Sequence, residues 1–316
     1  MAKVYPMLTR KRVMAAKVEA TCGTPVSLTA AEAVFNCVDP KINQTIEMAE
    51  REGQGSFSPI ASVIGGHTGQ MTFSIECYGG AALPPWASVL LPACGFAVST
   101  LVLTPSSTPP TGGGTGPITI TLGFFEDGVF KSLAGAMGNV KFTLTAGKIV
   151  RADFDYKGVW QAPVDAAILA PTYPTTLPLR FAKATTGCLL ATAMVQLAEL
   201  TIDMGNTVIL REDPSAAVGS GHLAAVIVGR RVNGTMNPEA RLVADVDYYG
   251  KFLASTEQAL SVTMGATNNG LAISIPKLQI TNIQGLDRNG IMANDITWQA
   301  NKSAAAGDDE ITLTFS

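Results

Sequence analysis

Apolar and polar residues alternate with a period of two through much of this 316-residue chain. Residues 71–77 and 140–145 alternate without interruption, which is typical of strands with one buried and one solvated face. The pattern recurs at 118–122, 260–264, 278–281 and 311–315, and hairpin turns rich in Gly and Asn are predicted at 126–128, 268–270 and 288–290. The chain is therefore expected to be mainly β, in an antiparallel sandwich or barrel.

Helical signals are few. A short helix is predicted around Trp86, where two prolines open the segment and Gly95 closes it. A second short helix is expected within 247–256, with an apolar face formed by Tyr249, Phe252 and Leu253.

The two halves of the chain share the order of their elements. Two pairs of strand segments match in their apolar positions, 141–145 with 277–281 and 149–156 with 291–298. Upstream, Arg51-Glu52 and Arg211-Glu212 each open a Gly/Ser-rich stretch that leads into a strand and then a short helix. Chance similarity between alternating strands explains any single match, but less readily the shared order. We expect two tandem copies of one β-rich module, each with a short flanking helix and a long loop.

Composition sets the expected boundaries. A basic N-terminal arm is predicted over residues 1–30, a first module over 31–165 and a second over 191–316. Between the modules, 166–190 is rich in Pro and lacks a clear period, so we interpret it as a linker. The long loops expected at 46–68 and 208–226 would order against a neighbouring molecule.

Charge excludes several functions. Charged residues make up only 15% of the chain, against about 25% in an average soluble protein. The net charge of −3 argues against a tightly held nucleic acid. The sequence has no run of 18 apolar residues, so no membrane span is predicted. The N-terminal residues lack the apolar block of a secretory signal. Five widely spaced cysteines are expected to remain reduced thiols.

Catalytic and metal-binding patterns are weak. The pairs Asp153/Asp155 and Asp245/Asp247 have the spacing that places two carboxylates on one face of a strand. Such a pair can act as acid and base, but more often it forms a solvated face, and in a channel it would repel a passing polyanion. His67 and His222 are far apart in sequence. We therefore predict no enzyme activity, no metal and no cofactor.

Several segments resemble the major tail tube proteins of long-tailed bacteriophages. The resemblance is carried by 8–13, 16–19 and 22–25, by the Pro-Pro-Trp segment at 84–96, by 154–158 and by the C-terminal 308–315. It implies a β-sandwich or barrel with a flanking helix and a protruding loop. It also implies subunits that stack as rings and form a hollow tube that conducts DNA into the host.

The duplication favours particular members of that family. Two-module tube proteins form trimeric rings with pseudo-sixfold symmetry, and the duplication points to the non-contractile tail of a siphophage. The resemblance further implies a virion component assembled in the bacterial cytoplasm, with tape-measure, tail-terminator and distal tail proteins as partners. DNA would pass transiently and without sequence-specific binding, and this chain would not insert into a membrane.

Two sets of residues are candidates for these roles. Contacts between subunits and rings are predicted for Arg10, Arg12, Arg51, Glu52, Arg211 and Glu212. Lumen-facing positions are predicted at Thr72, Ser74, Glu76, Thr143, Thr145, Asp245, Asp247, Gln279 and Thr281. A phage decoration protein and a tail-tip adhesin or carbohydrate-binding β protein remain alternatives, and a hydrolase on a β scaffold is a third.

Overall fold

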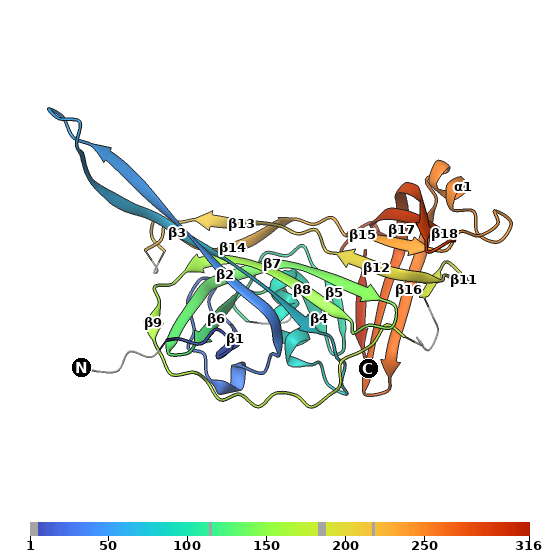
Figure 1. Cartoon of the computed structure of the whole chain (residues 1–316), viewed down its shortest axis with the longest axis horizontal. Helices are drawn as coiled ribbons and strands as arrows, with labels where there is room; N and C mark the ends of the chain where they lie inside the picture. The colour runs from blue at the N-terminus through green and yellow to red at the C-terminus, as the bar shows by residue number, and fades with distance from the viewer. Residues whose placement is uncertain (1–5, 114–115, 183–187, 217–218) are drawn as a thin grey trace.

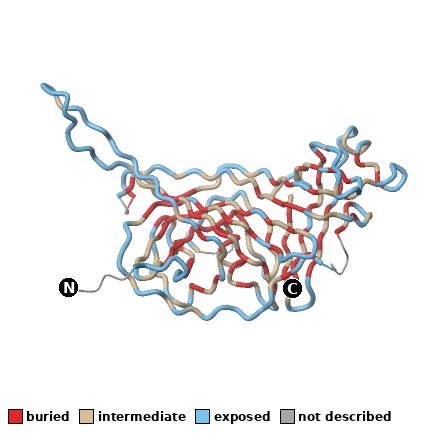
Figure 2. Tube along the Cα trace, in the orientation of Figure 1, coloured by how far each residue is buried: buried red, intermediate tan, exposed pale blue. Residues whose placement is uncertain are grey.

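The computed structural model describes residues 6–113, 116–182, 188–216 and 219–316. Strands account for 54% of the structure and helices for 6%, which confirms the predicted mainly β class. The molecule is elongated, with a thin arm at one end and a helical corner at the other (Figure 1). Buried residues gather in the body between these two ends, while the arm is almost wholly exposed (Figure 2).

The described strands follow one another along the chain with few helices between them. The first half contains β1 (Arg12–Val18), β2 (Cys37–Glu52), β3 (Pro59–Glu76), β4 (Phe96–Ser99), β5 (Val102–Pro105), β6 (Ile120–Glu126), β7 (Val129–Thr145), β8 (Arg151–Trp160) and β9 (Val164–Asp165). The second half contains β10 (Cys188–Leu190), β11 (Ala193–Met194), β12 (Leu197–Asp203), β13 (Thr207–Glu212), β14 (His222–Gly229), β15 (Asn233–Pro238), β16 (Glu257–Ala266), β17 (Asn269–Arg288), β18 (Ile291–Ala300) and β19 (Thr312–Phe315).

Helices are short and lie beside the sheets. They are the 3₁₀ turns η1 (Ala30–Glu32) and η3 (Pro92–Cys94), the π-type turn η2 (Trp86–Leu90) and the α-helix α1 (Tyr248–Leu253). Gly95 ends η3 with a φ of 86°, which confirms it as the predicted terminating glycine. In α1 only Tyr248 is buried, and Phe252 packs partly against the core. The expected apolar face is therefore wrong for Tyr249 and Leu253, which are 51% and 83% exposed.

Predicted hairpin turns form at the expected Gly and Asn residues. Asp127 and Gly128 adopt positive φ between β6 and β7, and Asn289 and Gly290 do so between β17 and β18. Asn268 has a φ of 66° between β16 and β17. In the first two of these turns both central residues have positive φ, so the twist of the turn matches that of the flanking strands.

One continuous sheet runs through both halves. Its strand order is β2-β3-β8-β7-β12-β15-β18-β17, and every neighbouring pair is antiparallel. The first four strands come from the first half and the last four from the second. The halves meet where β7 pairs with β12, with Lys141 opposite Asp203 and Leu144 opposite Leu200.

The two halves repeat one pattern of strand pairing. The first half has the order β1-β6-β7-β8-β3-β2, and the second has β10-β16-β17-β18-β15-β12. The long hairpin of β2 and β3 corresponds to a broken hairpin in the second half, where β12 and β13 replace β2, and β14 and β15 replace β3.

Pairing rows align the two halves residue by residue. One row in the first half is Ile42–Met71–Tyr156–Gly138, and the matching row in the second is Ile202–Gly234–Trp298–Ile280. In this alignment Asp153 corresponds to Asp295, as it does in the sequence match. The alignment does not fit the sequence match of 141–145 with 277–281, because Lys141 pairs with Asp153 whereas Asp295 pairs with Gln284. A bulge at Thr281 shifts that strand by one residue relative to its partner.

Most of the core is one large apolar cluster that spans both halves, and a smaller cluster forms around Val13, Ala15, Ala33 and Phe125. Trp86, Tyr156 and Trp298 are fully buried in the large cluster, and the Trp86 ring meets Phe315 edge to face at 5.5 Å. The C-terminal strand β19 pairs with β5 of the first half and with β17 of the second. Because β19 contacts both halves, its residues stabilise both at once. Burial of a large aromatic residue such as Phe315 stabilises the fold by about 2–3 kcal/mol.

The expected N-terminal arm is mostly part of the fold. Residues 12–18 form β1, which pairs with β6, and Met14 and Ala15 are buried. The preceding residues are also attached, because the Leu8 amide donates to Asp127 at 2.8 Å. A run of four apolar residues at 13–16 favours a strand covered on both faces rather than a solvated arm.

The two expected long loops are largely hairpins. Residues 46–52 and 59–68 belong to β2 and β3, so the loop between them spans only 53–58. In the second half, β13 and β14 leave the connection 213–221. Main-chain pairing within each hairpin satisfies the backbone groups that face the partner strand.

The Pro-rich segment runs along one side of the body from β9 toward β10 (Figure 1). Residues 166–179 contain no helix or strand, and the last part of this segment joins the core. The Leu179 amide donates to Cys77 and its carbonyl accepts from Val150 at 2.9 Å. Leu179 is buried, so the linker is fixed to the first half before β10 begins.

Candidate assembly surfaces

A polar face covers one side of the continuous sheet. A single row of paired residues crosses seven strands on this side and consists of Ser74, Asp153, Lys141, Asp203, Asn233, Gln299 and Gln279. The next row consists of Glu76, Arg151, Thr143, Thr201, Thr235, Thr297 and Asn282. Directly paired residues share a face, so these side chains form one surface.

Hydrogen bonds connect this polar face from strand to strand. Asp153 accepts from the Ser74 hydroxyl at 2.5 Å and from the Thr143 hydroxyl at 3.4 Å. Across the boundary between the halves, the Asn139 amide donates to Asp203 at 2.7 Å. Such side-chain bonds pre-organise the surface, because each carboxylate already has protein donors.

Farther into the second half the same face continues with hydroxyl and amide groups. Thr201 and Thr235 are hydrogen bonded through their hydroxyls at 2.9 Å. Gln299 donates to Gln279 at 3.3 Å, and Arg231 donates to Gln299 at 2.6 Å. The surface is therefore polar over its full width.

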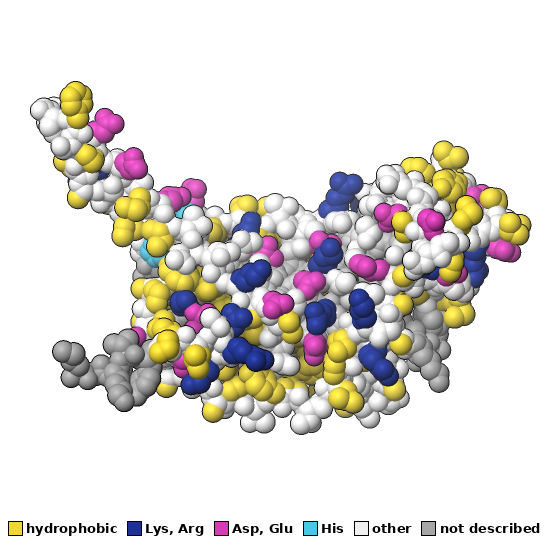
Figure 3. Space-filling model, in the orientation of Figure 1, with side chains coloured by type: hydrophobic (Ala, Val, Ile, Leu, Met, Phe, Trp, Pro, Cys, Tyr) yellow, Lys and Arg dark blue, Asp and Glu magenta, His cyan; other side chains and the backbone are white. Residues whose placement is uncertain are grey.

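Charges of both signs are interspersed on this face. Basic groups are contributed by Lys41, Lys141, Arg151 and Lys157, and acidic groups by Glu76, Asp153, Asp155, Glu199, Asp203 and Asp295. Figure 3 shows Lys and Arg next to Asp and Glu across the middle of the molecule. The face carries slightly more acid than base and has no single-sign patch that would hold a polyanion.

Six of the nine lumen candidates lie on the polar face. Thr72, Ser74, Glu76, Thr143, Thr145 and Gln279 all share rows with its other members. Thr281 is the extra residue of the β17 bulge, and its hydroxyl donates to the Thr297 carbonyl at 3.1 Å.

The other two candidates are not on strands. Asp245 lies in a turn, where its amide donates to the Leu242 carbonyl. Asp247 begins α1, and its side chain accepts from the Gly250 amide at 2.7 Å. The strand placement expected from their spacing is wrong, because Asp favours the N-cap position of a helix.

Sequence reasoning missed the central members of the face. Lys141, Thr201 and Thr235 lie in its middle, and none was among the candidates. The alternation in Leu-Thr-Ile-Asp at 200–203 carried a signal for Thr201. The pairing of β12 with β7 carried none, because strand order between distant segments leaves no local trace.

Both ends of the continuous sheet have free edges. Among the described residues, β2 pairs only with β3, so its other edge has no strand partner. Within the same part of the chain, residues 282–288 of β17 pair only with β18. Unpaired edges of this kind are ready to accept another strand.

The β2–β3 hairpin projects from the body as an arm (Figure 1). Its apolar side chains have no cover within the chain, since Phe57 is fully exposed and Ile64 and Met48 are 66% and 64% exposed. Ile46, Ile60 and Val63 are also exposed on this arm. Several exposed apolar side chains on one projecting element make the arm a candidate contact surface.

The predicted charged contact residues lie in three places. Arg51 and Glu52 end β2 near the arm tip, and Arg211 and Glu212 end β13 at the corresponding position. No ion pair involves these four residues within the described chain. Arg12 begins β1 and donates to the Pro40 carbonyl at 3.1 Å within the same chain, while Arg10 is exposed.

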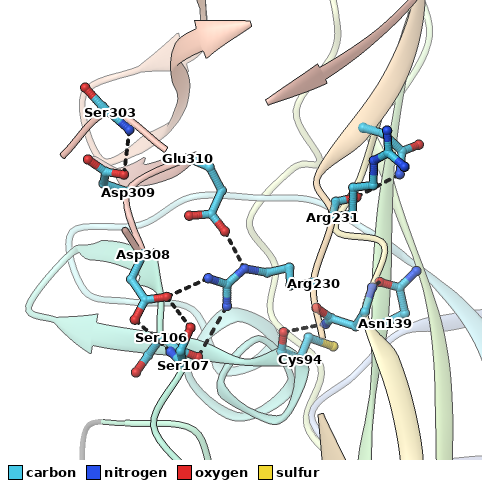
Figure 4. A network of polar contacts seen from close by, with 12 residues as sticks. Cys94, Ser106, Ser107, Asn139, Arg230, Arg231, Ser303, Asp308, Asp309 and Glu310 are labelled. Atoms are coloured by element: carbon cyan, nitrogen blue, oxygen red, sulfur yellow. Dashed lines mark hydrogen bonds and ion pairs between the residues drawn. The ribbon is translucent and has the colours of Figure 1, made fainter. Parts of the chain in front are cut away.

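A charge network joins the halves behind the sheet (Figure 4). Arg230, which follows β14, donates to Asp308 at 2.7 Å and to Glu310 at 2.5 Å, and also to the Ser106 carbonyl at 3.3 Å. Burial alone would raise the pKa of Asp308, but hydrogen bonds from Ser107 and Arg230 outweigh it and lower that pKa.

A family model for phage tail tube proteins matches residues 9–316. The match extends over nearly the whole chain. The chain belongs to the phage tail tube protein family. No curated protein gives a significant match.

Membership of this family makes the tube protein a structural component of a phage virion. None of its described helices has the length and apolarity needed to cross a bilayer. Among the described residues, no three His, Cys, Asp or Glu side chains gather as a metal site would require. All five cysteines are free thiols.

Proposed function

We propose that this tube protein is a duplicated subunit of a non-contractile siphophage tail, and that three copies form each ring. The polar face of the continuous sheet would line the lumen through which DNA enters the host. One observation carries the proposal: each half contributes four strands in the same order to one sheet with a single polar side. Three such chains present six equivalent four-strand units, which gives pseudo-sixfold symmetry.

The chemistry of the polar face suits passage of DNA. Interspersed charges and hydroxyl groups keep water at the wall, and a small acidic excess repels phosphate. Lysine and arginine are paired across the sheet with acidic or polar residues, such as Lys141 with Asp153 and Asp203. A polyanion would therefore find no continuous basic track on which to bind.

The exposed arm suits a contact between rings. The arm carries its apolar side chains beyond the body, together with Arg51 and Glu52 near its tip. Contact with neighbouring copies, in the same ring along the arm and in the next ring at its tip, would bury those side chains and give the two charged residues partners. Arg211 and Glu212 would make the corresponding contact from the second half, and Arg10 would reach a neighbour from the N-terminal side.

Further partners follow from the tube role. Tape-measure protein would occupy the lumen before DNA, and tail-terminator and distal tail proteins would cap the two ends of the tube. Assembly would take place in the bacterial cytoplasm, where the free thiols stay reduced.

Electron microscopy across a concentration series tests the tube role, with hollow tubes of stacked rings as the expected result. The lumen assignment is tested separately by cysteine labelling. In a Cys22→Ser, Cys37→Ser background, Thr143→Cys or Thr235→Cys should react with a bulky thiol reagent in monomers and be shielded in tubes. Labelling that is equally fast in both states would place the polar face elsewhere.

Two control positions complete the labelling design. Leu177→Cys in the Pro-rich segment lies off the sheet and is 76% exposed, so it reports whether assembly slows the reagent everywhere. Phe57→Cys at the arm tip reports contact between rings. Shielding at Thr143 without shielding at Leu177 would support the lumen assignment specifically.

A further inference from the structure

The contact between the two halves of one chain supplies a template for the contact between chains. In that internal contact, β12 of the second half pairs with β7 of the first over Glu199–Asp203. Asp203 lies opposite Lys141, and Ile202 lies opposite Phe142. Through this pairing the two four-strand units become one sheet.

Strands equivalent to this pair lie at the two outer edges of the chain. By the pairing rows, β2 corresponds to β12, and β17 corresponds to β7. Asn43 then corresponds to Asp203, and Gln284 corresponds to Lys141. Among the described residues, neither of these outer edges of the continuous sheet has a strand partner.

An independent feature supports the same alignment. The arm pairs Met48 with Ile64, and the second-half hairpin pairs Val208 with Ile227. The separation in sequence between Met48 and Val208 equals that between Ile42 and Ile202 in the sheet rows, and the separation between Ile64 and Ile227 equals that between Met71 and Gly234. The first of these separations also aligns Arg51-Glu52 with Arg211-Glu212. The sheet rows and the hairpin pairing therefore align the two halves of the chain in the same way.

We propose that β2 of one copy pairs antiparallel with β17 of the next copy, with Asn43 opposite Gln284 and Ile42 opposite Gly285. The inference rests on the proposed tube function and specifies the contact that closes the ring. Side-chain directions agree, because Asn43 shares a row with Gln70 and Gln284 shares one with Asp295, both on the polar face. Pairing in this register continues the polar face from copy to copy without a break.

The same correspondence places the arm on the next copy. Inside the chain, β14 lies over the first half, and a Cβ at Gly95, just after η3, would be 3.1 Å from the Ile227 side chain. Ile64 is the counterpart of Ile227, and α1 is the counterpart of the η2–η3 segment. Ile64 would therefore lie beside α1 of the neighbour, where Leu253 is 83% exposed.

A second copy is the occupant that the structure favours. The strands that correspond to the two free edges are β12 and β7. These two strands already pair with each other inside the chain, in the register that the proposal uses. A head-to-tail contact of this kind closes into a ring when the rotation between copies is one third of a turn.

Cysteine cross-linking tests the register. Asn43→Cys and Gln284→Cys are introduced together in the Cys22→Ser, Cys37→Ser background, and assembled protein is oxidised mildly. Directly opposed residues on antiparallel strands approach closely enough for a disulfide. We expect covalent species up to three copies on a non-reducing gel.

Matched variants control for chance proximity. Gln44→Cys with Gln284→Cys moves one thiol to the neighbouring residue, whose side chain points to the other face, and should cross-link at least ten-fold less. Lys141→Cys with Asp203→Cys should form the internal disulfide within single chains. Tubes in which the Asn43 pair cross-links no better than the Gln44 pair would overturn the proposed register, while the tube function would stand.

Amide hydrogen exchange of the unmodified protein gives a second test without substitutions. Assembly should slow exchange within 41–45 and 281–287 together, because both edges gain hydrogen-bonded partners. Assembled particles with unchanged exchange at either edge would overturn the pairing. If neither rings nor tubes form at any concentration, microscopy contradicts the tube function itself and the contact with it.

Discussion

The carboxylate of Glu19 accepts a hydrogen bond from the backbone amide of Gly135 at 2.7 Å, although the two residues are 116 positions apart. Glu19 is fully buried. It also accepts from the Gly23 amide at 2.8 Å and from the hydroxyls of Thr119 and Thr121 at 2.7 and 2.9 Å. Four donors thus surround one buried acid, which satisfies both of its oxygens.

This buried acid shapes the surface on which the second-half hairpin rests. Gly23 and Gly135 both adopt positive φ, and side chains at these positions would collide with Leu223 and Ala224 of β14. The backbone of β14 therefore approaches the first half at two glycines that Glu19 holds in place.

Replacing Glu19 with Gln should destabilise the monomer by about 1–3 kcal/mol. The new amide group would direct its hydrogens at one backbone amide and leave that buried donor without an acceptor. Urea unfolding measures the change. The matched control, Glu199→Gln on the exposed polar face, should be nearly neutral, and equal losses in both variants would contradict the role assigned to Glu19.

Gly135→Ala should cost more stability than Gly147→Ala. Both glycines have positive φ, which penalises any Cβ, but only at Gly135 would the Cβ lie 2.8 Å from Ala224. Gly147 has open space around it, so its cost is limited to the backbone term of about 1–2 kcal/mol. Thermal unfolding of the two variants compares them directly, and the steric argument fails if they lose the same stability.

Prediction from sequence succeeded where the signal was local. Alternation identified β3, and the turn residues Asp127-Gly128 and Asn289-Gly290 identified their hairpins. It failed where tertiary pairing decided the outcome. The 208–226 loop became β13 and β14, and the spacing of Asp245 and Asp247 did not reveal the cap of α1.

The polar face illustrates the same limit at the site. Six candidates were found because each lies on a strand with clear alternation, such as Thr72 and Ser74. Thr201 and Lys141 come together only because β12 pairs with β7, and no local pattern specifies that partner. The match between 141–145 and 277–281 was wrong, because the pairing rows place Lys141 on Gln284 rather than on Lys277, and alternating strands resemble one another in more than one register.

The Arg230 network should make stability depend on pH through Asp308. Because the folded-state pKa of Asp308 is lowered, its stabilising effect is fully present above the ordinary Asp pKa of about 4 and is lost as the pH falls through the lower folded value. Wild type should therefore exceed Asp308→Asn in melting temperature at pH 7 by a margin that shrinks below pH 4. Asp309→Asn is the adjacent control, since Asp309 accepts from the backbone amides of Ser303 and Ala304 rather than from Arg230. A margin that stays constant down to pH 3 would contradict the ionic role of Asp308.

Thiol reactivity should separate the five cysteines into two groups. Burial raises the pKa of Cys94 and of Cys188 to about 12, and it raises that of Cys77 as well. These three thiols should not react with an aromatic disulfide reagent at pH 8 until the protein unfolds, because the thiolate is the reactive form. Cys22 and Cys37 are half-buried, and burial raises the pKa of Cys37 to about 11, so at most two thiols per native chain should be titrated, with Cys37 as the slower one. A third fast thiol in the native protein would contradict the burial of the core cysteines.

Ile64→Asp on the arm should weaken assembly without affecting the fold of the monomer. Ile64 is 66% exposed in the single chain, so the substitution removes little buried surface there. In the proposed ring its side chain is covered by the neighbour, and the loss of a buried Ile costs about 1.5–3 kcal/mol per contact. That cost corresponds to an increase of roughly ten-fold or more in the concentration at which tubes form. Sedimentation and electron microscopy measure that concentration, while circular dichroism monitors the monomer.

Ser56→Asp adds the same charge in the loop at 53–58 without removing an apolar side chain, and it should assemble near the wild-type concentration. If both variants assemble like wild type, Ile64 is not part of a contact between copies.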